Sequence, residues 1–423
     1  MTATAQTTRS FQPRIRRTLI CAQIFSGLGS GSTLALGSIL AVDLSGSEAW
    51  AGSVNTALTL GTAFTAIPLA QLALARGRRF ALTTGLAAAI AGTALMVAAV
   101  MTGLFVLLLA GAFLVGLASA ANLQARFAVT DLAAPAHRGR DLSLVVWAIT
   151  IGAVAGPNMV GPGAALAAGL GIPAAAGPFL ISAAGMVVGA GIVGLFLRPD
   201  PLLTRRALDG SDVQPGSKRH SPVRLGWRIV RDNPATRGAV VAVVAAHAVM
   251  VAVMSMTPLH MQHHAGHAAG QQDTIALIGL TISLHIAGMY ALSPLMGWLT
   301  DRIGPAKTVL AGLGTLIIAV ALTGLASHHP AAITTGLVLL GLGWSATTVA
   351  GSTLLVSSLT PAQRVPVQGF SDATMSLAGA LGSAGAGPIM GSIGYPGISA
   401  LAALVVGAAA AVVLLLRLPA QHR

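Results

Sequence analysis

Sulfur and imidazole side chains gather in residues 245–296, within and between two apolar stretches. Met250 and Met254 have an MxxxM spacing in the first stretch. His285 and Met289 have an HxxxM spacing in the second. Residues four apart share a helix face, so each pair presents its two groups on one side of a helix. Thioether and imidazole groups are soft, uncharged ligands that suit Cu(I), so these four residues predict a copper site if their helices are neighbours.

Further potential ligands lie beside these pairs. The residues of a possible secondary metal site are His247, His260, Met261, His263, His264 and His267. The histidines between the two stretches either gather metal before it enters or are solvated loop residues, and the sequence leaves both interpretations open. Each methionine taken singly is more simply interpreted as a packing residue, because its flexible thioether fills irregular gaps.

The composition excludes a soluble protein. Of the 423 residues, 54% are hydrophobic and only 8% are charged, whereas about 25% are charged in a typical soluble domain. The net charge of +13 does not indicate nucleic-acid binding, because the basic residues lie between apolar segments in the pattern of a membrane protein. Cys21 is the single cysteine, so no intrachain disulfide can form.

Apolar segments of about 20 residues recur along the chain, each long enough to cross a bilayer as a helix. Met250 and His285 each lie about halfway along such a segment, at a depth where polar side chains are costly and usually functional. We predict twelve spans, near residues 18–40, 50–72, 80–101, 104–124, 143–165, 174–197, 238–259, 274–296, 308–327, 331–356, 367–390 and 397–417.

The basic residues fix the predicted orientation. With the N-terminus in the cytoplasm, all 24 Lys and Arg residues fall on the cytoplasmic side of these spans, as the positive-inside rule requires. We therefore expect a multi-pass protein of the inner (cytoplasmic) membrane with both termini cytoplasmic. A basic loop rich in Pro, Gly and Ser, 198–237, separates six spans in 1–197 from six in 238–423.

The loop after the eighth span carries a recognisable motif. Gly297-x-x-x-Asp301-Arg302-x-Gly304, followed by Lys307, resembles the loop motif of the major facilitator superfamily. The resemblance implies an all-α membrane protein with two six-helix bundles, a central site at mid-membrane, and alternating access by rocking of the halves.

The corresponding loop of the first half is a degraded copy of the same motif. It keeps Arg78 and Arg79 but has Leu74 where the motif has an acidic residue. In the fifth span, Gly152-x-x-x-Gly156-Pro157 is similar to the antiporter motif of the superfamily. We expect the two loops to contribute to gating.

Within the superfamily, the MxxxM and HxxxM pairs resemble the copper-importing branch linked to cytochrome oxidase assembly. That resemblance implies Met250, Met254, His285 and Met289 as ligands of a transported Cu(I) ion, with no prosthetic group. Asp372 is the only acidic residue inside a predicted span. His247 and His285 are the groups that could titrate in a proton-coupled carrier, whereas import of Cu(I) does not require coupling.

The sequence thus predicts a secondary transporter that imports Cu(I), acting as a monomer in the lipid bilayer without a nucleic-acid partner. No nucleotide-binding loop, catalytic triad or paired carboxylate is present, so we do not expect an enzyme. The alternative is a major facilitator carrier of a small organic solute, either a drug exporter or a vitamin importer, in which the same methionines line an apolar wall. A membrane sensor is a third class, for which we would expect an appended soluble domain.

Overall fold

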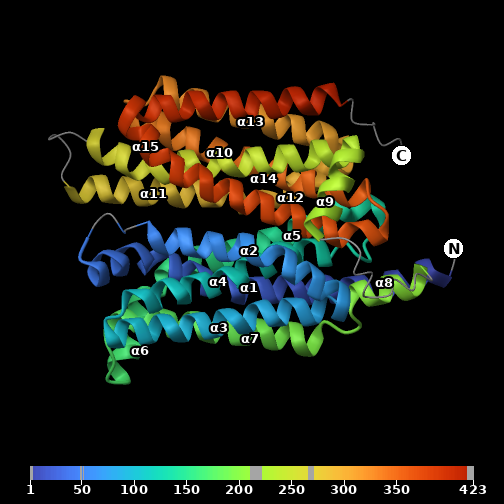
Figure 1. Ribbon diagram of the computed structural model, residues 1–423, viewed down its shortest axis with the longest axis horizontal. Coiled ribbons are helices and arrows are strands. Elements are labelled where there is room, and N and C mark those ends of the chain that lie inside the picture. The colour runs from blue at the N-terminus through green and yellow to red at the C-terminus, as the bar shows by residue number, and fades with distance from the viewer. Residues whose placement is uncertain (1–2, 48–49, 51, 210–221, 265–270, 417–423) are drawn as a thin grey trace. The chain divides into compact units, whose positions relative to one another are not determined.

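The computed structural model describes the whole chain except residues 1–2, 48–49, 51, 210–221, 265–270 and 417–423. The described residues form helices and no strands, which confirms the all-α fold (Figure 1). Contacts divide the chain into two compact units. Unit 1 comprises Met1–Pro135, Leu144–Arg228 and Thr360–Ala373, and unit 2 comprises Ala136–Ser143, Ile229–Leu359 and Thr374–Arg423. The predicted division into 1–197, 198–237 and 238–423 stays a prediction.

Helices of membrane-spanning length dominate both units. The first half of the chain contains α1 (Ala3–Ser45), α2 (Ser53–Arg76), α3 (Arg78–Thr102), α4 (Phe105–Ala128), α5 (Arg138–Asn158), α6 (Val160–Gly169) and α7 (Gly177–Phe196). The second half contains α10 (Pro234–His264), α11 (Gln271–Tyr290), α12 (Ser293–Ile303), α13 (Pro305–Leu325), α14 (Pro330–Ser357) and α15 (Pro361–Leu415). Among the described residues, nine helical segments are long and apolar enough to cross a membrane.

A count of twelve crossings fits these elements once α15 is divided. Its 55 residues would extend about 80 Å as one straight helix, against the ~30 Å of a bilayer core. Gly394 has φ +70°, which interrupts the helix. The two parts correspond to the predicted spans 367–390 and 397–417.

Two predicted spans are each broken into two helices. The span at 143–165 is α5 followed by α6, and the span at 274–296 is α11 followed by α12. Proline explains both breaks, because its ring clashes with the carbonyl four residues earlier. Pro162 and Pro294 each lie just inside the second helix of their pair. The hydropathy of these segments is continuous across the breaks, so apolar length alone predicts single spans.

In unit 1, α2 and α3 pack on α4, and α7 packs on α1 and α3. Small residues allow close contact between α3 and α4: a Cβ at Gly111 would lie 2.6 Å from the carbonyl oxygen of Gly92. Such contacts are typical of membrane helices, in which small residues let backbones approach. The predicted linker also contains two short helices, α8 (Pro201–Asp209) and α9 (Pro222–Asp232).

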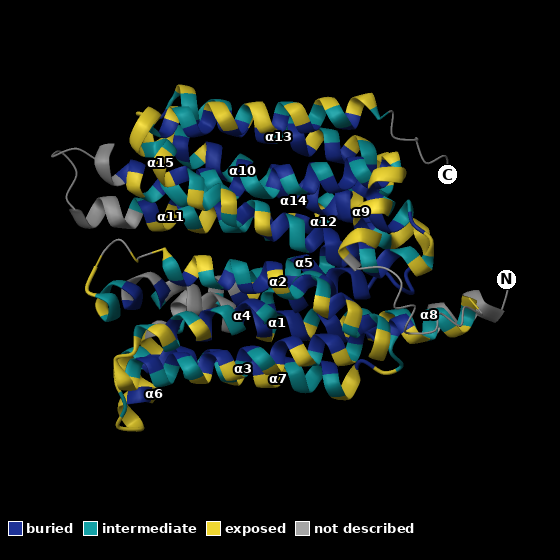
Figure 2. Cartoon of the chain, viewed as in Figure 1, coloured by how far each residue is buried: buried dark blue, intermediate teal, exposed yellow. Residues whose placement is uncertain are grey.

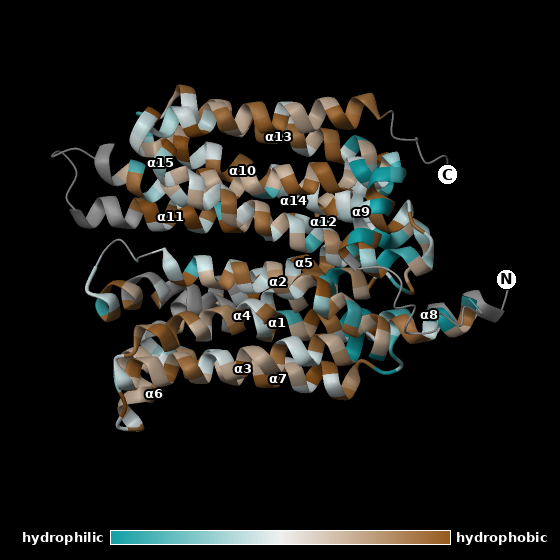
Figure 3. Ribbon diagram, viewed as in Figure 1, coloured by the Kyte–Doolittle hydropathy of each residue, from teal (hydrophilic) through white to brown (hydrophobic). Residues whose placement is uncertain are grey.

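In unit 2, α10, α11 and α13 pack on α14. Side chains of α14 are buried almost throughout its second half (Figure 2). Large apolar side chains such as Ile318 and Leu404 are exposed on the outer helices. Hydrophobic residues therefore cover outer faces, and hydrophilic residues gather near helix ends around α9, α12 and α8 (Figure 3). This distribution is the one expected for helices in lipid.

Candidate functional site

The predicted copper ligands lie on two helices of unit 2, with Met250 and Met254 on α10 and His285 and Met289 on α11. Met250 and Met289 are buried in the same hydrophobic core, and Met254 packs against that core from a half-buried position. Their neighbours are mostly Ala, Val, Leu and Ile. Packing therefore accounts for the three thioethers in this structure, and their role as metal ligands stays a prediction.

His285 is fully buried, with 0% of its surface exposed. Its Nδ1 lies 2.7 Å from the carbonyl oxygen of Leu337 on α14. A carbonyl can only accept, so Nδ1 carries the hydrogen and donates it. In the neutral ring Nε2 then holds a lone pair, and it has no hydrogen-bond partner among the described residues. This leaves Nε2 able to act as a ligand or as an acceptor.

Two of the secondary metal candidates, His260 and Met261, lie near the end of α10 and have other contacts there. His260 stacks on Tyr395 with ring centroids 4.3 Å apart, and its Nε2 lies 2.9 Å from the carbonyl oxygen of Ser327. Met261 is buried in the core of unit 2. These contacts fix the end of α10 against neighbouring helices.

The metal binding predicted for His263, His264 and His267 stays a prediction. His263 and His264 belong to the last turn of α10, and His267 lies outside the described residues. Within the described part of the chain, no three His, Cys, Asp or Glu side chains are grouped closely enough to hold a metal ion.

A cluster of polar aromatic side chains joins three helices of unit 2. Nε1 of Trp344 on α14 donates to Nδ1 of His247 on α10 over 3.1 Å. The ring of Tyr290 on α11 meets Trp344 edge to face, with centroids 5.7 Å apart. Tyr290 is the last residue of α11, immediately before its break from α12. We call His247, Tyr290 and Trp344 the aromatic cluster.

The aromatic cluster was not predicted from the sequence. Trp344 is nearly buried, whereas His247 and Tyr290 are partly exposed. Only 4% of the chain is aromatic, and the three residues are far apart in the sequence. The signal that could have found the cluster is Pro294, which marks a broken helix, because broken helices in transporters often border a binding site.

The loop motif of the second half organises one end of unit 2. Oδ1 and Oδ2 of Asp301 accept hydrogen bonds of 2.9 Å from the backbone N–H groups of Gly139 and Arg140, at the start of α5. A carboxylate is favourable there, since the first N–H groups of a helix lack partners and carry partial positive charge. Gly297 brings α12 close to the same turn, because a Cβ there would lie 2.6 Å from the carbonyl oxygen of Gly139.

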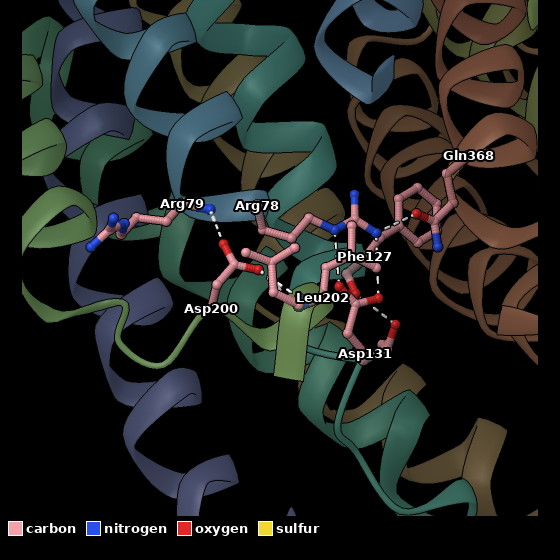
Figure 4. Close-up of polar contacts among 9 residues, drawn as sticks. Arg78, Arg79, Phe127, Asp131, Asp200, Leu202 and Gln368 are labelled. Carbon is pink, nitrogen blue, oxygen red and sulfur yellow. Dashed lines mark hydrogen bonds and ion pairs between the residues drawn. The ribbon is translucent and has the colours of Figure 1, made fainter. Parts of the chain in front are cut away.

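The corresponding loop of the first half holds a buried polar network in unit 1 (Figure 4). Nε of Arg78 donates to Oδ2 of Asp131 over 2.9 Å, and its Nη2 donates to Oε1 of Gln368 over 2.6 Å. Burial raises the pKa of Asp131 above its ordinary value, and the guanidinium of Arg78 opposes that shift. Arg79 contributes its backbone, because its N–H donates to Oδ2 of Asp200.

A carboxylate from outside the motif, that of Asp200, accepts a hydrogen bond at the start of α3. Its Oδ1 also accepts from the N–H groups of Leu202 and Leu203 at the start of α8, so one carboxylate serves two helix N-termini. Gly77 and Gly304 adopt nearly the same conformation in the two loops, with φ of +91° and +92°. The sequence signal for this role was Asp200 followed by Pro201, an N-cap and a first-turn proline.

Asp372, the acid predicted inside a span, is buried in unit 1 and forms an ion pair with Arg126 of α4. Both side chains are almost inaccessible. A buried charge of this kind is stable only when it is paired. The sequence identified the position of Asp372 but not its partner.

Comparison with known proteins decides the family. The family model of the Major Facilitator Superfamily matches residues 19–277 and 268–423. The chain belongs to the major facilitator superfamily. It is 35% identical to the MFS-type transporter YddS of Bacillus subtilis over 384 residues, covering 89% of the chain and 85% of that relative. It is 29% identical to the riboflavin transporter RfnT of Brucella anthropi over 389 residues, covering 91% of the chain and 92% of that relative.

Solved structures of superfamily members agree with the fold. The human organic anion transporter MFSD10 aligns with a TM-score of 0.74 at 15% identity, covering 95% of this chain and 99% of MFSD10. The Escherichia coli fucose:proton symporter FucP aligns with a TM-score of 0.63 at 18% identity, covering 94% of this chain and 97% of FucP. At these identities the likeness shows the fold alone.

Membership of the major facilitator superfamily confirms several predictions. The chain is a multi-pass membrane protein and a secondary transporter, and it is not an enzyme. The relatives named here do not support the copper-importing branch, and one of them is named for an organic vitamin. The indication of a substrate must therefore come from the side chains of the site.

Proposed function

We propose that this major facilitator protein carries a small organic solute with an aromatic ring system, and that the aromatic cluster contacts that ring. The supporting observation is the meeting of His247, Tyr290 and Trp344 on three helices. Aromatic side chains add about 0.5–1.5 kcal/mol per ring pair beyond the area that they bury.

The position of the aromatic cluster supports this proposal. Tyr290 precedes the break between α11 and α12, and interrupted helices of transporters commonly border the substrate site. The resemblance to RfnT adds weight, because that relative is named for the transport of riboflavin, a planar aromatic solute. Riboflavin is accordingly the first solute to test. We further propose, from the Lys and Arg pattern, a cytoplasmic-membrane location with both termini inside, and a monomer as the working unit.

The experiment is uptake of tritiated riboflavin into lipid vesicles that contain the purified protein. Trp344→Ala should lower uptake by about fivefold, equivalent to about 1 kcal/mol of lost ring contact. Trp50→Ala is the control for loss of a tryptophan away from the cluster, because Trp50 is exposed and contacts Phe105 within unit 1. Equal uptake by the two variants would reject the assignment of the cluster.

Import of Cu(I) is the second candidate, and one observation favours it. The Nδ1 atom of His285 is bound to a backbone carbonyl, and Nε2 is buried with a free lone pair. Metal-ligating histidines commonly have their second nitrogen fixed in this way. Met289 lies one turn further along α11, and Met250 lies in the same core. The proposed ligands under this candidate remain Met250, Met254, His285 and Met289.

The two candidates are separated by measuring both cargoes in the same vesicles. Radioactive copper is supplied with a reductant to keep it as Cu(I), and His285→Gln removes the imidazole while retaining an amide donor. Copper uptake that disappears in His285→Gln, without riboflavin uptake in the wild type, would favour copper. Riboflavin uptake without copper uptake would support the organic solute.

A further inference from the structure

A surface cavity of unit 2 has no role in the proposed transport site. Its volume is about 530 Å³, and it lies beside the start of α5 and the end of α12. The lining residues are Ala136, His137, Arg140, Trp298, Asp301 and Arg302. A cavity of this size is in the range of small-ligand sites, about 300–1,000 Å³.

The charges of the cavity favour an anionic ligand. Both carboxylate oxygens of Asp301 are occupied by the backbone N–H groups of Gly139 and Arg140. The side chains of Arg140 and Arg302 are exposed, and His137 adds a further basic group at the rim. Two guanidinium groups therefore line an opening in which backbone N–H groups already bind the carboxylate of Asp301. Guanidinium groups bind phosphate well.

The exposed face of α12 indicates that the anion belongs to a lipid. Leu295, Trp298 and Arg302 follow one another at helical spacing on one face. Leu295 is 51% exposed and Trp298 is 49% exposed, and Cζ of Arg302 lies 5.0 Å from the centroid of the Trp298 ring. The face thus passes from apolar to aromatic to cationic, in the order in which a phospholipid passes from acyl chain to interface to headgroup. Free phosphate has no apolar group that could contact Leu295 and Trp298.

The geometry points to a binding site for an anionic phospholipid, with its phosphate between Arg140 and Arg302 and an acyl chain along Leu295 and Trp298. In the orientation that the basic residues predict, this end of α12 faces the cytoplasm. Anionic lipids give the cytoplasmic leaflet a negative surface potential, to which each Lys or Arg near the surface is attracted. The site is separate from the aromatic cluster, so it does not depend on the proposed substrate.

Native mass spectrometry of the purified protein can test the site, with phosphatidylglycerol as the probe. The variant Arg140→Ala/Arg302→Ala should bind about tenfold less phosphatidylglycerol than the wild type. Both side chains are exposed. Alanine at position 140 keeps the backbone N–H that donates a hydrogen bond to Asp301, so the fold should persist. The matched control is Arg231→Ala/Lys307→Ala, which removes the same charge from exposed positions outside the cavity. It should retain wild-type binding.

Three further arms distinguish a lipid site from bulk charge attraction and from the binding of free phosphate. Arg140→Lys/Arg302→Lys should retain more binding than the double alanine variant, because it keeps the charge. Zwitterionic phosphatidylcholine should bind weakly to the wild type and should not distinguish the variants. Equal losses in the cavity variant and the control would overturn the site, since bulk charge would then account for binding. Displacement of phosphatidylglycerol by millimolar inorganic phosphate would overturn the lipid assignment.

Discussion

Arg78 and Asp131 form a buried ion pair in unit 1, with Nε of the guanidinium 2.9 Å from Oδ2 of the carboxylate. The pair joins the start of α3 to the turn after α4. Arg78 also reaches Gln368 near the start of α15, which binds a segment of the second half of the sequence into unit 1. The arginine is therefore a structural junction of three chain segments.

Replacing Arg78 with alanine should lower the stability of the protein by about 3–5 kcal/mol, because Asp131 would remain buried without its partner. Arg79→Ala is the control, since the contact of Arg79 with Asp200 is made by its backbone. Unfolding of the detergent-solubilised protein by SDS measures the free energy of unfolding of both variants. A loss for Arg78→Ala no larger than for Arg79→Ala would show that the ion pair is not a main support of unit 1.

Asp200→Ala should destabilise the region around α8 by about 1–2 kcal/mol, because the carboxylate caps this helix and also accepts from Arg79. Limited proteolysis should then cut sooner within 201–209 than in the wild type. Asp200→Asn keeps an acceptor oxygen and should be intermediate. The nearby Asp209→Ala removes a side-chain contact with Arg205 at the other end of α8. Unchanged cleavage in Asp200→Ala relative to Asp209→Ala would contradict the capping role.

Gly77→Ala should cost more stability than Gly304→Ala. Both glycines have a positive φ, at which alanine is strained by about 1 kcal/mol. The added methyl group of Gly77→Ala would also clash with the Asp200 carboxylate, whereas at Gly304 no atom of the described residues beyond its chain neighbours lies within 4 Å. Thermal unfolding followed by tryptophan fluorescence compares the two variants. Equal losses would show that the Asp200 carboxylate moves away at no cost.

The fold was largely predictable because hydropathy and charge are local properties of the sequence. Apolar length located the spans, whereas the division into two six-span halves stays a prediction. The breaks after Asn158 and Tyr290 were not predicted, because hydropathy continues across them while the prolines that cause them lie inside the second helix of each pair. The helices α8 and α9 were missed because they lie in a polar segment that hydropathy assigns to a loop.

The candidate site was less predictable because the hydrogen-bond partner of a side chain depends on the packing of helices that are distant in the sequence. His285 was correctly placed in a span, but its contact with Leu337 depends on the packing of α11 against α14. Arg78 meets Gln368 across 290 positions of sequence. The methionine spacing is visible in the sequence, whereas the place of His247 in the aromatic cluster depends on its hydrogen bond from Trp344.

Met250→Leu should leave transport unchanged if the methionine is a packing residue. Leucine has a similar volume and keeps the apolar contacts of the core, so the stability loss should stay below about 1.5 kcal/mol. Uptake of riboflavin and of copper by the same vesicles tests this. A selective loss of copper uptake would instead identify the thioether as a ligand.

The most direct test of the central claim is the uptake of riboflavin and Cu(I) by the wild type, Trp344→Ala and Trp50→Ala in matched vesicles. The aromatic cluster predicts saturable riboflavin uptake by the wild type and by Trp50→Ala, about fivefold weaker uptake by Trp344→Ala, and no copper accumulation above that of empty vesicles. Copper accumulation that requires His285, together with riboflavin uptake no greater than in empty vesicles, would contradict an organic-solute carrier.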